Sequence, residues 1–169
     1  AECFPPEFVS VVEGGRKENQ ALLDQKFDYI FFTGGVEVGK EVMSKAAKHL
    51  TPVTLELGGK SPCIVDRTAR LDLAAKRIVF GKLLNCGQTC VAPDYLLIDR
   101  RVKDRFLEYV KRWITVMYGQ NPLDNGGYVR MVNRKHFDRV MGLIDPEKVV
   151  FGGKGDWSTL KIQPTILDD

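Results

Sequence analysis

The stretch FFTGGVEVGKEV, Phe31 to Val42, indicates the architecture of the first half of the chain. An apolar aromatic run ends at Gly34, and Val38, Val42 and Ala46 then follow at helical spacing. This order predicts a buried strand, a tight glycine turn and a helix with one apolar face. In α/β proteins, ligands bind at such a place, beyond the carboxyl end of a strand and at the N-terminus of the next helix.

From Gly34 the same stretch also reads G-x-x-x-x-G-K, which is one residue short of a P-loop. A P-loop needs Ser or Thr at the next position, because the hydroxyl helps to hold Mg²⁺. Glu41 stands there, and its carboxylate would lie against the polyphosphate. The stretch therefore does not favour an NTPase. The fingerprint G-x-G-x-x-G is also absent, so a nucleotide site and a purely structural turn remain equal alternatives for these glycines.

The charged residues are interleaved along the chain, which argues against one class of function. The 25 basic and 22 acidic residues give a net charge of +3, and KDRFLEYVKR is typical of the solvated face of a helix. A nucleic-acid-binding protein would gather its basic residues into a patch. We therefore expect no nucleic-acid partner.

The apolar runs and the cysteines indicate the cellular compartment of the protein. No apolar run is long enough to span a membrane, and the start AECFPPEF has no apolar core of a signal peptide. Four scattered cysteines do not form a disulfide framework, and free thiols suit a reducing compartment. We therefore expect a soluble cytoplasmic protein with no membrane segment. No metal is expected, because no second Cys pair or nearby His completes a zinc set around Cys86 and Cys90.

Strands and helices alternate along the chain, which predicts an α/β protein. Apolar runs separated by amphipathic helices indicate buried parallel strands joined by helical crossovers. A shift in composition at residues 84–94 marks the one candidate domain boundary. The predicted strands are 8–15, 29–32, 53–57, 63–66 and 95–99, and the predicted helices are 18–26, 36–50, 71–84, 102–117 and 136–144. One side of the long helix is predicted to carry Val102, Phe106, Val110, Trp113 and Met117.

Glu56 stands out within LELGGK, Leu55 to Lys60, because it is a carboxylate inside an apolar strand. Its two leucine neighbours point to the opposite face, and two glycines follow at once, so the backbone can approach another group closely. A carboxylate beside apolar surface suits the role of a general base. An exposed carboxylate on an edge strand is an equal alternative.

The loop NCGQTC, Asn85 to Cys90, ends in a thiol that a substrate could reach. A nucleophilic cysteine needs access and a local field that favours the thiolate, and a loop position offers the access. The sequence pattern alone does not show whether Cys86 or Cys90 is the nucleophile. Cys63, within SPCIV, is typical of a small buried hydrophobic residue.

Three motifs in this order, FTGG-x-x-x-GK, LELGGKSP and GQTCVAPDY, closely resemble the aldehyde dehydrogenase superfamily. HLTPVTLELGGKSPCIVD and NRKHFDRVMGLI are most similar to its class 3 branch. The resemblance implies that residues 1–84 are the C-terminal portion of a parallel, Rossmann-like NAD(P)-binding domain that includes the general-base strand. Residues 85–169 would be the N-terminal portion of an α/β catalytic domain with the cysteine loop. Because family members are much longer, we expect this fold to be incomplete at both ends.

The resemblance also implies roles in the NAD(P)⁺-dependent oxidation of an aldehyde to its carboxylic acid. Cys90 matches the nucleophile that carries the thioester, and Glu56 matches the general base that activates water to hydrolyse it. Val38 would pack on the adenine, the turn amides would lie near the pyrophosphate, and the main chain of Leu57 would lie near the nicotinamide carboxamide. The residues that match the cofactor segment are Gly34, Gly35, Val36, Glu37, Val38, Gly39 and Leu57. The implied partner is a small-molecule aldehyde, and the parent enzyme is expected to be a homodimer.

Two positions depart from the usual pattern of the family. Gly35 replaces the serine of FTGS and so lacks a hydroxyl near the cofactor, and Cys86 stands where a small residue is more common. Cys86 lies four residues before Cys90, so an inhibitory disulfide between them is a hypothesis. Segments that the family uses for the ribose, the oxyanion and oligomerisation have no match in this sequence. We therefore expect little turnover by the chain alone.

Two other functions remain open. A CoA-acylating aldehyde dehydrogenase would pass the acyl group to CoA, but such relatives generally lack a general-base Glu in the matching strand. A non-catalytic nucleotide-binding module would have a decayed site, and the presence of both Glu56 and Cys90 argues against it. The motifs identify neither the aldehyde nor the choice between NAD⁺ and NADP⁺.

Overall fold

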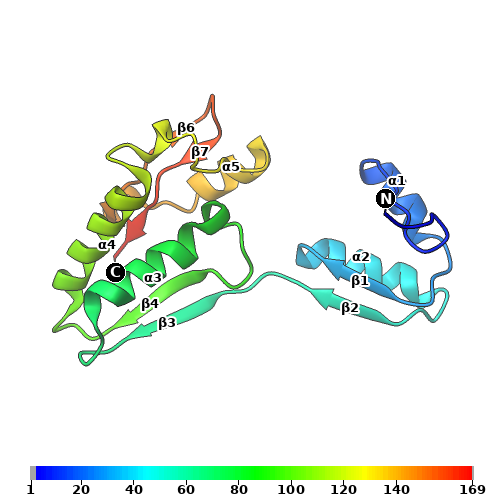
Figure 1. Ribbon diagram of the computed structural model, residues 1–169, viewed down its shortest axis with the longest axis horizontal. Coiled ribbons are helices and arrows are strands. Elements are labelled where there is room, and N and C mark those ends of the chain that lie inside the picture. The colour runs from blue at the N-terminus through cyan, green and yellow to red at the C-terminus, as the bar shows by residue number, and fades with distance from the viewer. Residues whose placement is uncertain (1–2, 169) are drawn as a thin grey trace. The chain divides into compact units, whose positions relative to one another are not determined.

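The computed structural model describes residues 3–168 and divides into two compact units (Figure 1). The first unit ends at Gly58 and the second begins at Gly59. Each unit contains a parallel pair of strands joined by a helix, so the predicted α/β class with parallel pairing is confirmed. The predicted boundary between residues 84 and 85 concerns the domains of a larger enzyme and stays a prediction.

The first unit is built around the strand–turn–helix stretch. Strand β1 (Ile30–Thr33) leads into helix α2 (Val36–Ala47), which returns the chain to strand β2 (Val53–Glu56). The two strands pair in parallel along their whole length, without a bulge. A parallel pair needs such a crossover, because the chain must return to the same end of the sheet before the second strand begins.

Helix α2 has an apolar face as predicted, but it ends about one turn earlier than predicted. Val38, which was expected on this face, is 48% exposed. Leu50 takes a left-handed conformation with φ 55°, which commonly occurs just beyond the end of a helix. The buried residues of the helix are Gly39, Val42 and Ala46.

The predicted strand at residues 8–15 is wrong. The segment contains no strand and exposes the apolar side chains of Phe8, Val11 and Val12. A strand is held by hydrogen bonds to a neighbour, and within residues 3–168 no strand pairs with this segment. Helix α1 (Arg16–Leu23) then begins earlier than predicted, because the carboxylate of Glu18 in its first turn accepts from the Gly15 amide at 2.7 Å, and it also ends earlier than predicted.

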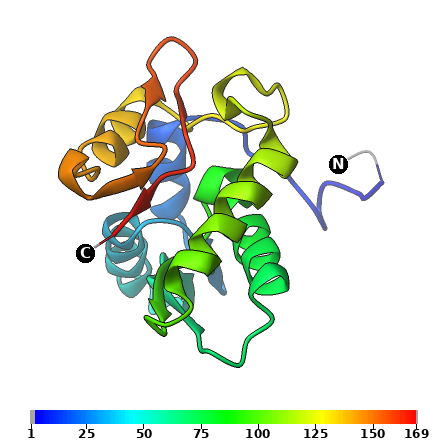
Figure 2. The same ribbon diagram turned by 90° about the vertical axis from the view of Figure 1, so that its left-hand side faces the viewer.

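The second unit repeats the strand–helix–strand plan. Strand β3 (Ser61–Val65) is followed by helix α3 (Leu71–Leu83) and by strand β4 (Pro93–Ile98), which pairs with β3 in parallel. The long helix α4 (Lys103–Tyr118) packs beside α3 (Figures 1 and 2). These four elements confirm the strands and helices predicted between residues 63 and 117.

The main core of this unit joins α3 and α4 to the strand pair. Ile114 completes the buried face of α4, where the sequence favoured Trp113. Trp113 is half-buried, and its indole Nε1 donates to the Asp72 carboxylate at 2.7 Å. This bond places the N–H edge of the ring in a polar environment and not in the core. The buried residues of this core are Val65, Leu71, Ala75, Val79, Phe106, Val110 and Ile114.

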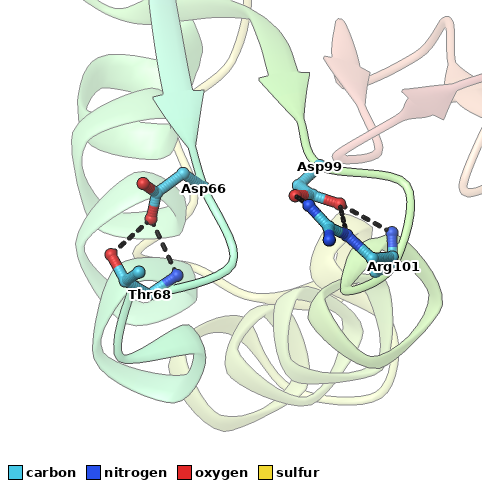
Figure 3. A network of polar contacts seen from close by, with 4 residues as sticks. All are labelled: Asp66, Thr68, Asp99 and Arg101. Carbon is cyan, nitrogen blue, oxygen red and sulfur yellow. Dashed lines mark hydrogen bonds and ion pairs between the residues drawn. The ribbon is translucent and has the colours of Figure 1, made fainter.

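Two aspartates fix the turns that follow the parallel strands (Figure 3). Asp66 accepts from the amide and the hydroxyl of Thr68 at 2.8 and 2.6 Å, and these bonds lower its pKa. Asp99 accepts from the Arg101 guanidinium at 2.9 and 2.6 Å, which lowers the pKa of Asp99 to about 2. The Asp99 amide also donates to the Val65 carbonyl at 3.0 Å, so both strands end at the same edge.

The remaining elements form a region of short strands and helices. Helix α5 (Arg134–Met141) begins before its predicted range, because the Asn133 side chain caps it by accepting from the His136 amide. A second small core in this region consists of Met131, Phe137 and Ile162. The other elements are the antiparallel pairs β5 (Val149–Phe151) with β8 (Ile166–Leu167) and β6 (Gly155–Asp156) with β7 (Lys161–Ile162), and the 3-10 helices η1 (Leu84–Gly87), η2 (Pro122–Asp124) and η3 (Pro146–Lys148).

Residues 3–168 contain neither a candidate membrane-spanning helix nor a candidate metal-binding cluster. No helix in this range is both long enough and apolar enough to cross a membrane. No group of three or more His, Cys, Asp or Glu side chains in it could hold a metal ion.

Phe106 is the side chain on which we expect the stability of the second unit to depend most. It is 0% exposed, whereas Phe80 on α3 is 59% exposed. Removal of the buried ring leaves a cavity, so Phe106→Ala should lower the free energy of unfolding by about 3–5 kcal/mol. The matched change Phe80→Ala should lower it by less than about 0.5 kcal/mol. Urea denaturation followed by circular dichroism measures both, and equal losses would contradict this account of the core.

Candidate active site

Parallel pairing brings Glu56 beside the glycine turn in the first unit. Glu56 lies opposite Thr33 in the register of β1 and β2, and its carbonyl accepts from the Gly34 amide at 3.0 Å. Gly34 opens the turn into α2, and Glu56 is exposed at the end of β2, where water can reach it. The predicted base and the predicted cofactor turn are therefore neighbours.

The start of helix α2 presents free amides beside apolar surface. Gly35 caps the helix without a side-chain hydrogen bond, and a Cβ added there would meet no atom within 4 Å. The Gly39 amide donates to the Gly35 carbonyl at 2.9 Å, so the amides between them have no acceptor within the helix. Val36 and Val38 are 49% and 48% exposed. This combination suits a ligand that has both an anionic group and a flat apolar part.

Gly39 allows helix α2 to approach the end of β2 closely. A Cβ built on Gly39 would lie 2.9 Å from Cδ2 of Leu57. A larger residue at this position would therefore push against Leu57. Glu37, in the same turn of the helix, forms an exposed ion pair with Lys40 at 3.0 Å. The predicted cofactor residues thus form one continuous feature, made of the glycine turn, the first turn of α2 and the strand end that packs on it.

The cysteine loop of the second unit begins with a left-handed turn. Asn85, Cys86 and Gly87 have φ values of 51°, 55° and 76°. Glycine and asparagine adopt this conformation readily, but cysteine rarely does. A non-glycine residue held there costs about 1–3 kcal/mol and persists only where the surrounding structure fixes it. The loop therefore depends on contacts with the rest of the unit.

Gln88 supplies such contacts through its side-chain amide. Its Nε2 donates to the Asn85 carbonyl at 3.1 Å and to the Arg130 carbonyl at 3.2 Å, and its Oε1 accepts from the Val132 amide at 3.1 Å. Sequence patterns predicted no role for Gln88, and the one available signal was a long amide side chain inside a glycine-containing loop. A surface cavity of about 560 Å³ beside these bonds is lined by Asn85, Gln88, Val129, Arg130, Met131 and Val132.

Gly59 lies directly against the main chain of Cys90. A Cβ built on Gly59 would lie 2.6 Å from the Cys90 carbonyl oxygen, a distance that no side chain could occupy. A Cβ built on Gly58 would meet no atom within 4 Å. The glycine pair of LELGGK predicted a close backbone approach, and the group approached is the main-chain carbonyl of Cys90, the residue that carries the candidate nucleophile.

Exposure distinguishes the two cysteines of the loop. Cys90 is exposed, whereas Cys86 is half-buried. Burial raises the pKa of the Cys86 thiol, and the hydroxyl of Tyr128 acts in the opposite direction without cancelling this effect. A raised pKa leaves less thiolate at neutral pH, so Cys86 is the poorer nucleophile. Cys63, on β3, is also half-buried, so Cys90 has better access than either.

An ion-pair cluster ties together the segments that flank the loop. Asp94, at the start of β4, pairs with Lys60 at 3.1 Å and with Lys82 at 3.3 Å. Partial burial pushes the pKa of Asp94 upward, but the two ammonium groups outweigh it and hold the pKa below its ordinary value. Lys82 lies in the last turn of α3, and Lys60 lies just before β3. Both sides of the cysteine loop are thus linked to the start of β3.

Comparison with known proteins identifies the family of this chain. The aldehyde dehydrogenase family matches it over residues 1–169. The chain is 50% identical over 94% of its length to the dimeric NADP-preferring aldehyde dehydrogenase of Canis lupus familiaris. It is also 50% identical over its full length to aldehyde dehydrogenase family 3 member A2 of Rattus norvegicus. It covers 35% and 36% of these two proteins, and so spans about a third of their length.

Solved structures of aldehyde dehydrogenases have a similar fold over most of the chain. The substrate-bound state of Staphylococcus aureus AldH aligns with a TM-score of 0.90 at 46% identity, and covers 98% of this chain and 37% of that one. An indole-3-acetaldehyde dehydrogenase in complex with NAD⁺ aligns with a TM-score of 0.76 at 32% identity, and covers 89% and 33%. The resemblance predicted from the three motifs, with family 3 relatives, is confirmed. The chain belongs to the aldehyde dehydrogenase family.

Proposed function

We propose that this chain carries the nucleophile and the general base of an enzyme that oxidises an aldehyde to its carboxylic acid with NAD(P)⁺. The observation that carries the proposal is the exposure of Cys90 at the end of a loop held by Gly59 and Gln88. The relatives support it, because their names state that they are aldehyde dehydrogenases.

Cys90 performs the first step of the proposed reaction. Its thiolate adds to the carbonyl carbon of the aldehyde, and the new C–S bond gives a thiohemiacetal. Loss of hydride from the same carbon then leaves a thioester on Cys90. Sulfur suits both steps, because a thiolate is a strong nucleophile and later a good leaving group. NAD(P)⁺, when bound, supplies the hydride acceptor.

Glu56 performs the second step. Its carboxylate takes a proton from water, the resulting hydroxide adds to the thioester carbonyl, and the thiolate of Cys90 leaves. The products are the carboxylic acid and the free nucleophile. The exposed position of Glu56 at the end of β2 supports this role, because water can reach it. Measurement of free acid against acyl-CoA as the product separates hydrolysis from transfer to CoA.

The start of α2 fits the dinucleotide. The amides between Gly35 and Gly39 suit the pyrophosphate, and the exposed side chain of Val38 suits one face of the adenine. The main chain of Leu57, whose side chain packs on Gly39, would lie near the nicotinamide carboxamide. One relative is named NADP-preferring and one aligned structure holds NAD⁺, so we propose NAD⁺ or NADP⁺ as the cofactor.

The activity belongs, in this proposal, to a longer homodimeric enzyme. The canine relative is named as dimeric, and this chain covers only 35% of it.

Medium- or long-chain aliphatic aldehydes and aromatic aldehydes are the substrates that the family 3 resemblance favours. We expect little turnover by the chain alone, because a missing oxyanion donor typically costs about 3 kcal/mol of barrier. Light scattering and a panel of aldehydes, applied to the longer enzyme, test these points.

Glu56→Gln tests the division of the reaction into two steps. The amide keeps the size of the side chain but cannot take a proton from water. The variant should therefore release a single equivalent of NADH or NADPH and retain the thioester on Cys90. Cys90→Ser should release none, and Glu41→Gln, the same chemical change on helix α2, should behave as the unchanged protein. Absorbance and intact-mass spectrometry of a full-length family enzyme that contains these residues measure this, and continued turnover by Glu56→Gln would contradict the assigned role.

Gly59→Ala tests whether the main chain at Cys90 must stay where it is. The added methyl group would meet the Cys90 carbonyl oxygen at 2.6 Å, so the loop would have to shift. We expect acylation of Cys90 in the same enzyme to slow by about 10-fold to 100-fold. Gly58→Ala is the matched control, because its Cβ would meet no atom within 4 Å. Equal acylation rates in the two variants would show that this contact does not position the thiol.

A further inference from the structure

We propose that Gln88 is a positioning residue for Cys90, and that its side-chain amide holds the strained cysteine loop in the geometry that presents the thiol. The inference rests on the proposed function, because it concerns how the nucleophile of that reaction is held. Gln88 does not itself react with the aldehyde. It acts through the main chain of the loop that ends in Cys90.

The side chain of Gln88 makes the pair of hydrogen bonds that the main chain of one residue makes between parallel strands. In such a pair, one residue donates to a carbonyl on one side of its partner and accepts from an amide on the other side. Gln88 does the same around Met131, with Nε2 donating to the Arg130 carbonyl at 3.2 Å and Oε1 accepting from the Val132 amide at 3.1 Å. An amide side chain is required, because one end must donate and the other must accept.

The segment that Gln88 contacts is itself firmly held. Met131 is 5% exposed and belongs to the second core of this unit. Its amide donates to the Leu160 carbonyl at 2.9 Å. Nearby, the buried hydroxyl of Tyr128 donates to the Ile162 carbonyl at 2.9 Å. Gln88 therefore connects the cysteine loop to the main chain of a segment that the buried side chain of Met131 anchors in the second core, while Arg130 and Val132 themselves are exposed.

The loop that Gln88 holds needs such a connection. Asn85 and Cys86 are left-handed residues that persist only where the surrounding structure fixes them. Both the main-chain amide and the side-chain Nε2 of Gln88 donate to the Asn85 carbonyl at 3.1 Å. Two hydrogen bonds from Gln88 therefore close this turn. Cys90 follows two residues later. A shift of the turn would therefore move the thiol relative to the aldehyde.

Two substitutions with side chains of similar length separate the effect of the Gln88 hydrogen bonds from the effect of its packing. Gln88→Met removes both the donor and the acceptor. Gln88→Glu keeps an acceptor for the Val132 amide but turns a second oxygen toward the carbonyls of Asn85 and Arg130. Gln25→Glu is the matched control, because Gln25 is exposed and, within residues 3–168, its side-chain amide donates only to the nearby Ala21 carbonyl, at 3.1 Å.

We expect both Gln88 variants to slow acylation of Cys90 by aldehyde and NAD(P)⁺ on the order of 100-fold, without a change in the KM for the cofactor. Hydrogen exchange at the Val132 amide should become faster in Gln88→Met. The rate of iodoacetamide labelling of Cys90, followed across pH, should differ from that of the unchanged protein. Gln25→Glu should alter none of these quantities. Circular dichroism confirms that each variant is folded, and Gln88→Glu serves if Gln88→Met is not.

The outcomes distinguish this inference from the proposed function. If the unchanged enzyme forms no adduct on Cys90, the proposed function fails, and iodoacetamide labelling still tests the positioning. If the folded Gln88 variants acylate and label at the same rates and with the same pH profile as the unchanged protein, the inference is overturned. That result would stand even if exchange at Val132 became faster, because Gln88 would then stabilise the loop without positioning the thiol.

Discussion

Parallel pairing across a helical crossover is the constraint on which both units of the chain depend. It forces a helix between the paired strands and aligns the strands end to end. In the first unit, the carboxyl ends carry the Gly34 turn and Glu56, which share a hydrogen bond of 3.0 Å. This is the edge at which α/β proteins bind ligands. The candidate base and the candidate cofactor turn are neighbours because the register leaves no other arrangement.

In the second unit, parallel pairing has the same effect at the amino ends of the strands. Gly59 lies just before β3 and Cys90 lies just before β4, so parallel pairing brings the two segments together. The main chains approach so closely that a Cβ on Gly59 would lie 2.6 Å from the Cys90 carbonyl oxygen. Gln88 then holds the other side of the loop through bonds to residues 130 and 132. A strained loop that is fixed on two sides can expose a thiol to solvent and still hold it in one position.

Local patterns predicted the elements that carry their own signals. The turn from β1 into α2, the crossover α3 and the long helix α4 follow from apolar spacing and glycine breaks. Helix ends were predicted less well, because caps such as the Asn133 side chain on α5 depend on single hydrogen bonds. The strand predicted at residues 8–15 failed because an apolar run becomes a strand only beside a partner. Gln88 was missed because its partners lie 42 and 44 residues away, and no local pattern encodes them.

Site-resolved alkylation of the four cysteines, followed by mass spectrometry, tests most directly the claim that this loop presents Cys90 as the nucleophile. Cys3 is also exposed and serves as the internal reference, whereas Cys63 and Cys86 are half-buried. The account predicts that Cys90 labels faster than Cys63 and Cys86, and that an aldehyde with NAD(P)⁺ changes the rate at Cys90 but not at Cys3. Similar labelling of all four thiols, with no effect of the aldehyde and the cofactor, would contradict it.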